Sequence, residues 1–277
     1  MTQLGIVDIR EIVRIIKDNH SFDLSSFALT SLKYRLEKTF QKNNLKSVEV
    51  FFEKLNNEPQ FADTFIGQLL VPSTEMFRDP SVWRWLRDNI IVNLSSNELI
   101  NFKVWLPYCV TGNELFTIAI ILKECGILET SRIYCSYFSD YNLEEIKSGK
   151  YPLKKHEVSV ENYKRFQGAA ELNKYIEVKD TYAQRDTDLI KNVEFIKSDF
   201  SFSERPKNSK LVIFRNAMIY ANPGLQSEMY SVAYSALSAT GYLLIGINEN
   251  LRQTSGDDYA FEPVNEDEHI YRRKIKG

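Results

Sequence analysis

Charged and polar side chains gather in two short stretches that interrupt apolar sequence. One is STEMFRDP at 73–80, and the other is FRNAMIY at 214–220, where Arg215 and Asn216 directly follow the apolar run 211–214. An arginine beside a buried strand is costly to desolvate unless it has a partner. Each stretch therefore indicates either a functional site or a structural ion pair, and the residues alone favour neither.

Residues that follow predicted strands are a second source of candidates, because ligands of open α/β sheets bind beyond the carboxyl ends of the strands. The turn PYCVTGNE at 107–114 precedes an apolar helix and could aim backbone N–H groups at an anionic or carboxylate-bearing ligand. It contains a single glycine, so a plain strand–helix connection is an equal interpretation. Asp140, after the next strand, could accept hydrogen bonds from ribose hydroxyls or could simply begin a helix.

The order of apolar segments indicates the fold that must position these residues. From residue 101, short apolar runs alternate with helix-like segments, which predicts parallel βαβ units in a doubly wound, mostly parallel α/β sheet. The runs at 241–248 and 269–275 could close the sheet as a hairpin. Near the start, Ile9, Ile12 and Ile16 fall at helical spacing, which predicts a small all-α domain before the sheet.

Three parts are expected along the chain: a helical N-terminal domain at 1–70, a linker and helix at 71–100, and an α/β domain at 101–277. The stretch at about 151–190 is rich in Lys, Glu and Tyr and has no strong period of either kind. We expect it to be a small insertion that stands off the sheet.

Charge gives limited information about partners. The 277 residues carry 35 Lys and Arg against 37 Asp and Glu, a net charge of −2, which disfavours general binding to nucleic acid or to anionic membranes. Locally, four cations cluster on the second predicted helix: Lys33, Arg35, Lys38 and Lys42. This cluster could dock an acidic partner, although a solvated helix face is the commoner outcome.

Several compartments and site types are not expected. The three cysteines are odd in number and have no CxxC spacing, which disfavours both a disulfide framework and a metal site. The first residues have no signal-peptide pattern, and no stretch holds the 18 apolar residues that a membrane span needs. A cytoplasmic protein without membrane insertion is therefore expected.

Six segments, taken in order, resemble the CheR family of chemotaxis-receptor methyltransferases, which are protein-glutamate O-methyltransferases. They are LTSLKYRLEKTF, STEMFRDPSVW, WLPYCVTGNE, LEEIKSGKYPL, FRNAMIYANPGLQSEMY and GYLLIGINENL, and they span nearly the whole chain. FRNAMIY with the Gln-containing helix after it is the most specific of them. The resemblance implies a class I, Rossmann-like fold and a role in chemotaxis signal transduction. It also implies S-adenosylmethionine as methyl donor, with S-adenosylhomocysteine as product.

The resemblance further implies roles for individual residues. Arg78 and Tyr220 would be catalytic, beside the transferring methyl group and the incoming carboxylate, and Asp140 would hold the ribose if it replaces the usual acid. The partner would be a receptor or another signalling protein, bound through the cation cluster or the 151–190 insertion. Besides Asp140, the resemblance implies cofactor contacts for seven residues, one of which is Arg78 again. They are Thr74, Arg78, Glu114, Asp199, Phe200, Phe214 and Arg215.

Several positions depart from the family pattern. The family turn reads approximately GCSTGEE, whereas this chain has YCVTGNE, so Tyr108 replaces a small residue and Asn113 replaces an acid. Tyr137 stands at the usual acid after the second strand, and Pro72 and Asp199 stand where asparagine is usual. Loss of a buried hydrogen bond to the ribose costs about 1–3 kcal/mol. Weakened or lost cofactor binding is therefore expected, and with it an alternative function as an inactive CheR-like binding module.

Overall fold

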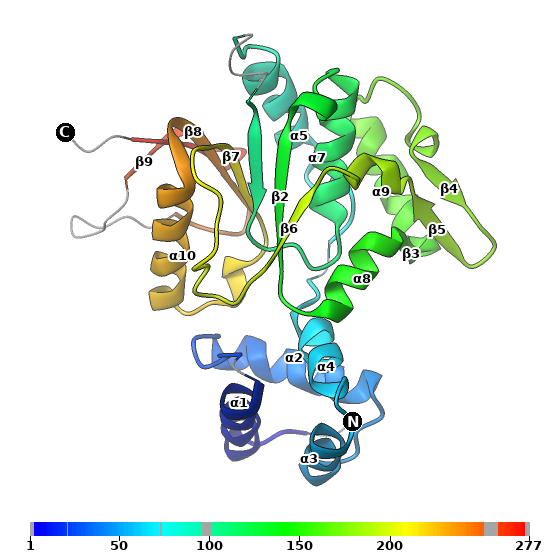
Figure 1. The fold of residues 1–277 in the computed structure, drawn as a ribbon, viewed down its shortest axis with the longest axis vertical. Coiled ribbons are helices and arrows are strands. Elements are labelled where there is room, and N and C mark those ends of the chain that lie inside the picture. Colours follow the sequence, from blue (N-terminus) through cyan, green and yellow to red (C-terminus); the bar gives the residue numbers. More distant parts are fainter. Residues whose placement is uncertain (1–2, 21, 73, 96–100, 252–259, 275–277) are drawn as a thin grey trace.

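The computed structural model describes residues 3–20, 22–72, 74–95, 101–251 and 260–274. Ser73, in the first polar stretch, lies outside them. A body of four helices precedes a seven-stranded sheet, and it lies against one end of that sheet (Figure 1). The arrangement places the loops at that end of the sheet next to the N-terminal helices.

The N-terminal body forms because each of its helices buries one apolar stripe. Phe51 is central to its packing: its ring centroid lies 5.4 Å from that of Phe40 and 4.7 Å from that of Phe65. Ser47 caps the third helix, since its side chain accepts a hydrogen bond from the backbone N–H of Val50. The four helices are α1 (Ile6–His20), α2 (Leu29–Lys42), α3 (Val48–Asn57) and α4 (Phe61–Leu70).

The central sheet has the strand order β6-β2-β1-β7-β8-β10-β9. The first five strands in that order pair in parallel, which confirms the predicted doubly wound, mostly parallel α/β sheet. β10 pairs antiparallel with β8, but it forms its hairpin with β9, a strand that the sequence pattern did not reveal. The strands are β1 (Lys103–Leu106), β2 (Arg132–Tyr137), β6 (Glu194–Lys197), β7 (Ser209–Phe214), β8 (Leu237–Ile245), β9 (Phe261–Asn265) and β10 (Ile270–Arg273).

Alternate residues of the buried strands point to opposite faces of the sheet and build two cores. Trp105 and Val212 belong to the core shared with α10 (Pro223–Ala236) and the N-terminal helices. Val104 and Leu211 belong to the second core, beneath α7 (Asn113–Glu124). Helices therefore cover both faces, and α7 and α10 lie on opposite sides of the sheet (Figure 1).

The other helical segments are α9, with 14 residues, and several shorter ones that precede or connect the strands. None of the described helices combines the length and the apolar character that crossing a membrane requires. They are α5 (Pro80–Trp85), the π-helical turn η1 (Leu86–Ile91), α8 (Asp140–Ser148), α9 (Leu153–Phe166) and the 3-10 turns η2 (Leu128–Thr130), η3 (Leu172–Lys174), η4 (Thr187–Ile190) and η5 (Met218–Tyr220).

A second, three-stranded sheet lies in the region where the sequence suggests an insertion. It has the order β3-β5-β4 and is antiparallel, with β3 at Lys150–Pro152, β4 at Ile176–Val178 and β5 at Tyr182–Arg185. The helix α9 runs between β3 and β4 along the chain. Figure 1 shows this small sheet beside α8 and α9, away from the central strands.

The N-terminal body is joined to the α/β domain by a helix cap that comes from another helix. The two carboxylate oxygens of Asp63 in α4 accept hydrogen bonds from the backbone N–H groups of Asp140 and Tyr141, at 3.0 and 2.8 Å. These N–H groups belong to the first turn of α8, which has no internal partners for them. Asn142 adds a third bond across the junction, from its Nδ2 to the carbonyl of Gly67 at 3.1 Å.

Replacement of Asp63 by alanine is expected to lower the free energy of unfolding by about 1 kcal/mol, the usual cost of losing an N-terminal helix cap. Urea denaturation measures this change. Asp18→Ala is the matched control, because Asp18 forms only an exposed ion pair with Arg14 within α1, and its loss costs less than about 0.5 kcal/mol. Equal effects of the two substitutions would contradict the assigned capping role.

Candidate active site

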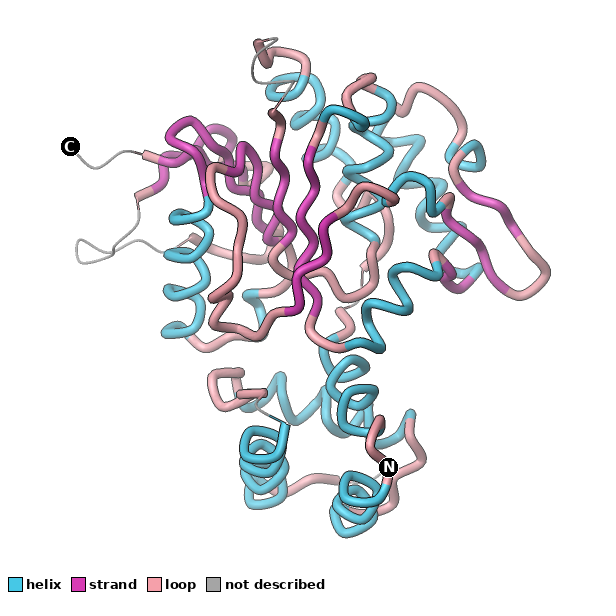
Figure 2. The backbone as a smooth tube through the Cα atoms, viewed as in Figure 1, coloured by secondary structure: helices cyan, strands magenta, loops and turns pink. Residues whose placement is uncertain are grey.

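The loops that follow β1, β2, β7 and β8 gather between the sheet and the N-terminal helices (Figure 2). The chain leaves β1 toward β2 on one side, and β7 lies on the other side, so this is a topological switch point. Ligands of open α/β sheets bind at such a point. A ligand site is therefore expected between the sheet and the N-terminal helices.

Glu114 and Thr74 meet at the first turn of α7. The Thr74 hydroxyl donates to Glu114 Oε1 at 2.9 Å, and Asn113 Nδ2 donates to the Thr74 carbonyl, also at 2.9 Å. Burial raises the pKa of Glu114, whereas the Thr74 hydrogen bond and the nearby Arg215 and Arg78 oppose that rise. The sequence predicted both Thr74 and Glu114, and the structure brings them together.

Arg215 forms a buried ion pair with Asp79. The side chain of Arg215 is 1% exposed, its Nη2 donates to Asp79 Oδ2, and its guanidinium lies 5.6 Å from the ring centroid of Trp83. Burial lowers the pKa of Arg215, although Asp79, Glu114 and Glu249 raise it. The sequence left open whether this arginine marks a site or an ion pair, and the structure contains the ion pair within the candidate site.

Glu249 is a buried residue that sequence reasoning missed. Its carboxylate accepts hydrogen bonds from the backbone N–H groups of Asn216, Met218 and Gly246, at 2.9, 2.6 and 2.6 Å. It thereby fixes the loop after β7 against the end of β8. Burial raises the pKa of Glu249, and these backbone donors oppose the rise. Its position just after β8 is the signal that could have identified Glu249 as a candidate, since the residues after the other parallel strands were all candidates.

Tyr220 stacks on an arginine from the N-terminal body. The guanidinium carbon of Arg35 lies 3.5 Å from the ring centroid of Tyr220, and Arg35 Nη1 donates to the Leu69 carbonyl at 2.6 Å. Arg35 is 7% exposed, so its assignment to an exposed docking cluster was wrong. Its helix position turns it inward, whereas Lys33, Lys38 and Lys42 are exposed.

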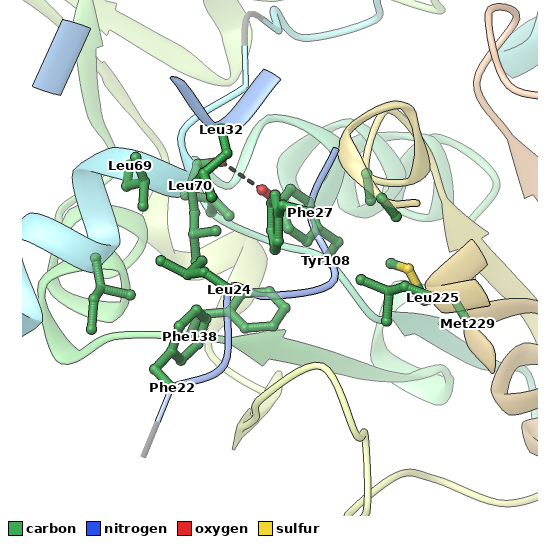
Figure 3. Packing of buried hydrophobic residues seen from close by; sticks show 14 of the residues in the cluster. Phe22, Leu24, Phe27, Leu32, Leu69, Leu70, Tyr108, Phe138, Leu225 and Met229 are labelled. Atoms are coloured by element: carbon green, nitrogen blue, oxygen red, sulfur yellow. Dashed lines mark hydrogen bonds between the residues drawn. The ribbon is translucent and has the colours of Figure 1, made fainter. Parts of the chain in front are cut away.

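Tyr108 fills the space beyond the end of β1. Its hydroxyl donates to the Leu70 carbonyl at 2.6 Å, and its ring lies 5.2 Å from that of Phe138 and 6.3 Å from that of Phe200. Figure 3 shows Tyr108 reaching toward Leu70, with Phe27 of the N-terminal body beside it. Burial raises the pKa of Tyr108 strongly, so the phenol is neutral and held as a hydrogen-bond donor. An aromatic cluster therefore occupies this part of the switch point.

The remaining predicted residues have local roles. Asp140 is exposed and forms an ion pair with Lys197 at 2.9 Å, and it begins α8. Asp199 is also exposed, and its carboxylate accepts hydrogen bonds from the N–H and hydroxyl groups of Ser201. Phe200 stacks on Phe138 at 4.9 Å, and Phe214 is completely buried in the core. The structure does not bring Asp140 or Asp199 into the buried cluster of Glu114, Arg215 and Glu249.

The described residues fit one end of S-adenosylmethionine better than the other. Glu114 and Thr74 can accept hydrogen bonds from the ammonium group of its amino-acid end. At the nucleoside end, the ring of Tyr108 fills the position where the resemblance expects a small residue, and Asp140 pairs with Lys197. The nucleoside end therefore has a less favourable set of residues than the amino-acid end while Tyr108 keeps this position.

The fold and the site together define the class of the protein. A central sheet with five parallel strands and an antiparallel closing pair, with a carboxylate at the start of α7, has the architecture of Rossmann-like methyltransferases. The family model described as CheR methyltransferase, SAM binding domain, matches residues 72–267. The chain therefore belongs to the CheR methyltransferase family.

Similar proteins are methyltransferases by name, and two of the three described here are named for chemotaxis. "Putative methyltransferase Cher3" of Pseudomonas putida is 28% identical over 96% of this chain and 97% of its own length. A "Chemotaxis protein methyltransferase" of Listeria innocua is 23% identical over 91% of this chain and 92% of its own. A protein of the same name from Borreliella burgdorferi is 25% identical over 91% of each chain. These similarities cover the N-terminal helices as well as the matched domain.

Proposed function

We propose that this protein transfers the methyl group of S-adenosylmethionine to glutamate carboxylates of a receptor or another signalling protein. Membership of the CheR family supports methyl transfer. The observation that carries the proposal is the buried charge cluster at the switch point, where Glu114, Arg215, Asp79 and Glu249 are all fixed by partners. Half-buried Arg78 adds a positive charge that acts on both Glu114 and Arg215.

The residues of the chain orient the reactants rather than act as a base. A glutamate carboxylate has an ordinary pKa of about 4.3, so it is ionised at pH 7 and needs no proton removed before it attacks a methyl group. When bound, the cofactor supplies that methyl group on a positively charged sulfur. Arg78 holds the incoming carboxylate by charge-assisted hydrogen bonds, and the Tyr220 hydroxyl donates another. Arg35 keeps the Tyr220 ring in place by stacking at 3.5 Å.

The partner docks through charge in this proposal. Lys33, Lys38 and Lys42 are exposed along α2 and suit an acidic helix of a signalling protein. The small sheet β3-β5-β4 is a second candidate contact, since it stands off the central strands. The protein acts inside the cell on the cytoplasmic part of such a partner.

Replacement of Arg78 by alanine is expected to reduce methyl transfer roughly hundredfold, as the loss of one charged group that stabilises a transition state commonly does. The assay incubates a purified receptor cytoplasmic domain with methyl-labelled cofactor and then adds alkali, which hydrolyses glutamate methyl esters and releases labelled methanol. Arg84→Ala is the control, because Arg84 lies on α5 and donates to the Arg165 carbonyl. Label that resists alkali would contradict glutamate as the acceptor.

A second candidate function, which the family membership does not favour, is that of a CheR-like binding module without activity. It rests on the aromatic cluster around Tyr108, which occupies the end of β1 where the resemblance expects a small residue. Calorimetric titration with S-adenosylhomocysteine separates the two functions. Micromolar binding by the wild type that is lost in Glu114→Ala supports the enzyme, whereas no heat at millimolar ligand with the wild type supports the module.

A further inference from the structure

A separate cavity lies where the N-terminal body, the linker and the small sheet meet. It has a volume of about 550 Å³, within the range of small-molecule sites. Its walls come from the linker at Val71 and Pro72, from the turn before α7, from α8 and from the strands β3 and β5. Of the candidate active-site residues, Thr74 lines it.

A buried arginine without an anionic partner forms part of the wall. Arg185 is 2% exposed, and its guanidinium donates to the Thr111 carbonyl and to Asn113 Oδ1. It lies between two rings, 4.3 Å from the centroid of Tyr151 and 5.0 Å from that of Phe116. Within the described part of the chain, no carboxylate forms an ion pair with it, although Arg215 has Asp79. A buried charge without a counter-ion is costly, so an anion that reaches this wall would be stabilised.

Three buried polar atoms around this cavity lack hydrogen-bond partners in the described residues. They are Thr111 Oγ1, Asn142 Oδ1 and Arg185 Nε, and all three residues line the cavity. Buried polar atoms in folded proteins nearly always have partners. Burial also lowers the pKa of Arg185 to about 10. A mostly apolar wall therefore contains one group of polar atoms whose hydrogen bonds are incompletely satisfied.

The rest of the lining indicates the chemistry of the ligand. Lys42 and Lys150 add exposed positive charge, whereas Glu145 is a single opposing acid. Lys155 also lines the cavity but already pairs with Glu75. Two or more cations around one cavity match a phosphate better than a carboxylate, since phosphate carries more charge and more acceptor oxygens. The rings of Tyr141, Tyr151 and Tyr182 line the same cavity and suit a planar group.

We infer that this cavity binds a small organic phosphate with a planar ring, of the size of a nucleoside monophosphate. The methyl donor does not match it, because S-adenosylmethionine has no phosphate and carries a positive sulfonium. The inference goes beyond the proposed function, since it needs neither methyl transfer nor an open space at Tyr108. The position of the cavity, between the linker and α8, would let such a ligand bridge the two parts of the chain.

The test is calorimetric titration of the full chain with adenosine monophosphate, adenosine and inorganic phosphate at constant ionic strength. Adenosine monophosphate is expected to bind at least tenfold more tightly than either fragment. Lys150→Ala and Tyr182→Ala are each expected to weaken that binding at least fivefold, because Lys150 lies over the Tyr182 ring at the cavity rim, 5.0 Å from its centroid. Lys210→Ala is the matched control, since Lys210 lies 5.5 Å from the centroid of Tyr242 on the central sheet.

Lys150 is exposed and Tyr182 is half-buried, so their alanine variants are expected to fold. Arg185 is 2% exposed, and its substitution would also destabilise the fold. Absence of binding by adenosine monophosphate would overturn the inference. If inorganic phosphate binds as tightly as adenosine monophosphate, the cavity does not recognise a planar ring. If adenosine binds as tightly, the cavity does not recognise the phosphate. Either result would contradict the inference. Displacement of adenosine monophosphate by S-adenosylhomocysteine would mean that the cavity belongs to the cofactor site, which would also overturn it.

Discussion

Tyr108→Ala is expected to bind S-adenosylhomocysteine at least tenfold more tightly than the wild type, a gain of about 1.4 kcal/mol or more. The ring of Tyr108 fills the space beyond β1, and alanine leaves that space open to the nucleoside. The same substitution is expected to lower the free energy of unfolding by about 3 kcal/mol, because a large buried ring is lost from a packed cluster. Calorimetric titration and urea denaturation measure the two changes on one protein preparation.

Tyr108→Phe is the control for this result. It keeps the ring but removes the hydroxyl that donates to the Leu70 carbonyl, which is buried. Its binding of S-adenosylhomocysteine is expected to stay near that of the wild type, since the space remains filled. If Tyr108→Ala binds no more tightly than Tyr108→Phe, the ring is not what limits access to the site.

Asp79→Ala is expected to lower the free energy of unfolding by about 3–5 kcal/mol, because it leaves the buried guanidinium of Arg215 without its counter-ion. Denaturation in guanidinium chloride or urea measures the loss. The backbone of Asp79 adds to this loss of stability. Asp79 has a φ of 54°, in the left-handed region, where aspartate is tolerated better than alanine.

The control for Asp79 is the exposed pair of Arg272 and Glu262 on the closing hairpin, whose side chains are 50% and 39% exposed. Glu262→Ala is expected to cost less than about 1 kcal/mol, because water replaces the lost partner. A loss in Asp79→Ala as small as that in Glu262→Ala would show that the buried pair adds nothing to stability. It would also weaken the case that this pair shapes the active site.

The sequence predicted the elements better than the contacts between them. The parallel strands could be predicted because apolar runs such as 211–214 are buried on both faces, and α7 because its apolar residues follow a polar turn. Thr74, Glu114 and Arg215 could be predicted because they stand where the family pattern has cofactor contacts. Asp79, the ion-pair partner of Arg215, was not singled out, because its role depends on a left-handed turn that brings it close to the end of β7.

The sequence did not predict the direction in which individual side chains point. Arg35 was grouped with the exposed lysines of α2, yet it lies on the buried face of that helix, where it stacks on the Tyr220 ring. Asp140 was a candidate ribose ligand, but Lys197 and the first turn of α8 engage it instead. The contact partners of both side chains lie in distant segments, Tyr220 for Arg35 and Lys197 for Asp140, and the sequence pattern did not identify these partners.

The cap that Asp63 provides on α8 helps to define which segment of the chain can fold on its own. The family model matches from residue 72 onward, but α8 takes its first hydrogen-bond acceptors from α4, and the core beneath α10 includes apolar side chains of α1 and α2. A fragment that began at residue 72 would expose Phe138 and Tyr108 to water. It would also leave the backbone N–H groups of Asp140 and Tyr141 without their acceptors, although the Ser139 side chain would still cap α8. We therefore expect the stretch of chain that folds on its own to include the N-terminal helices and to be longer than the segment that the family model matches.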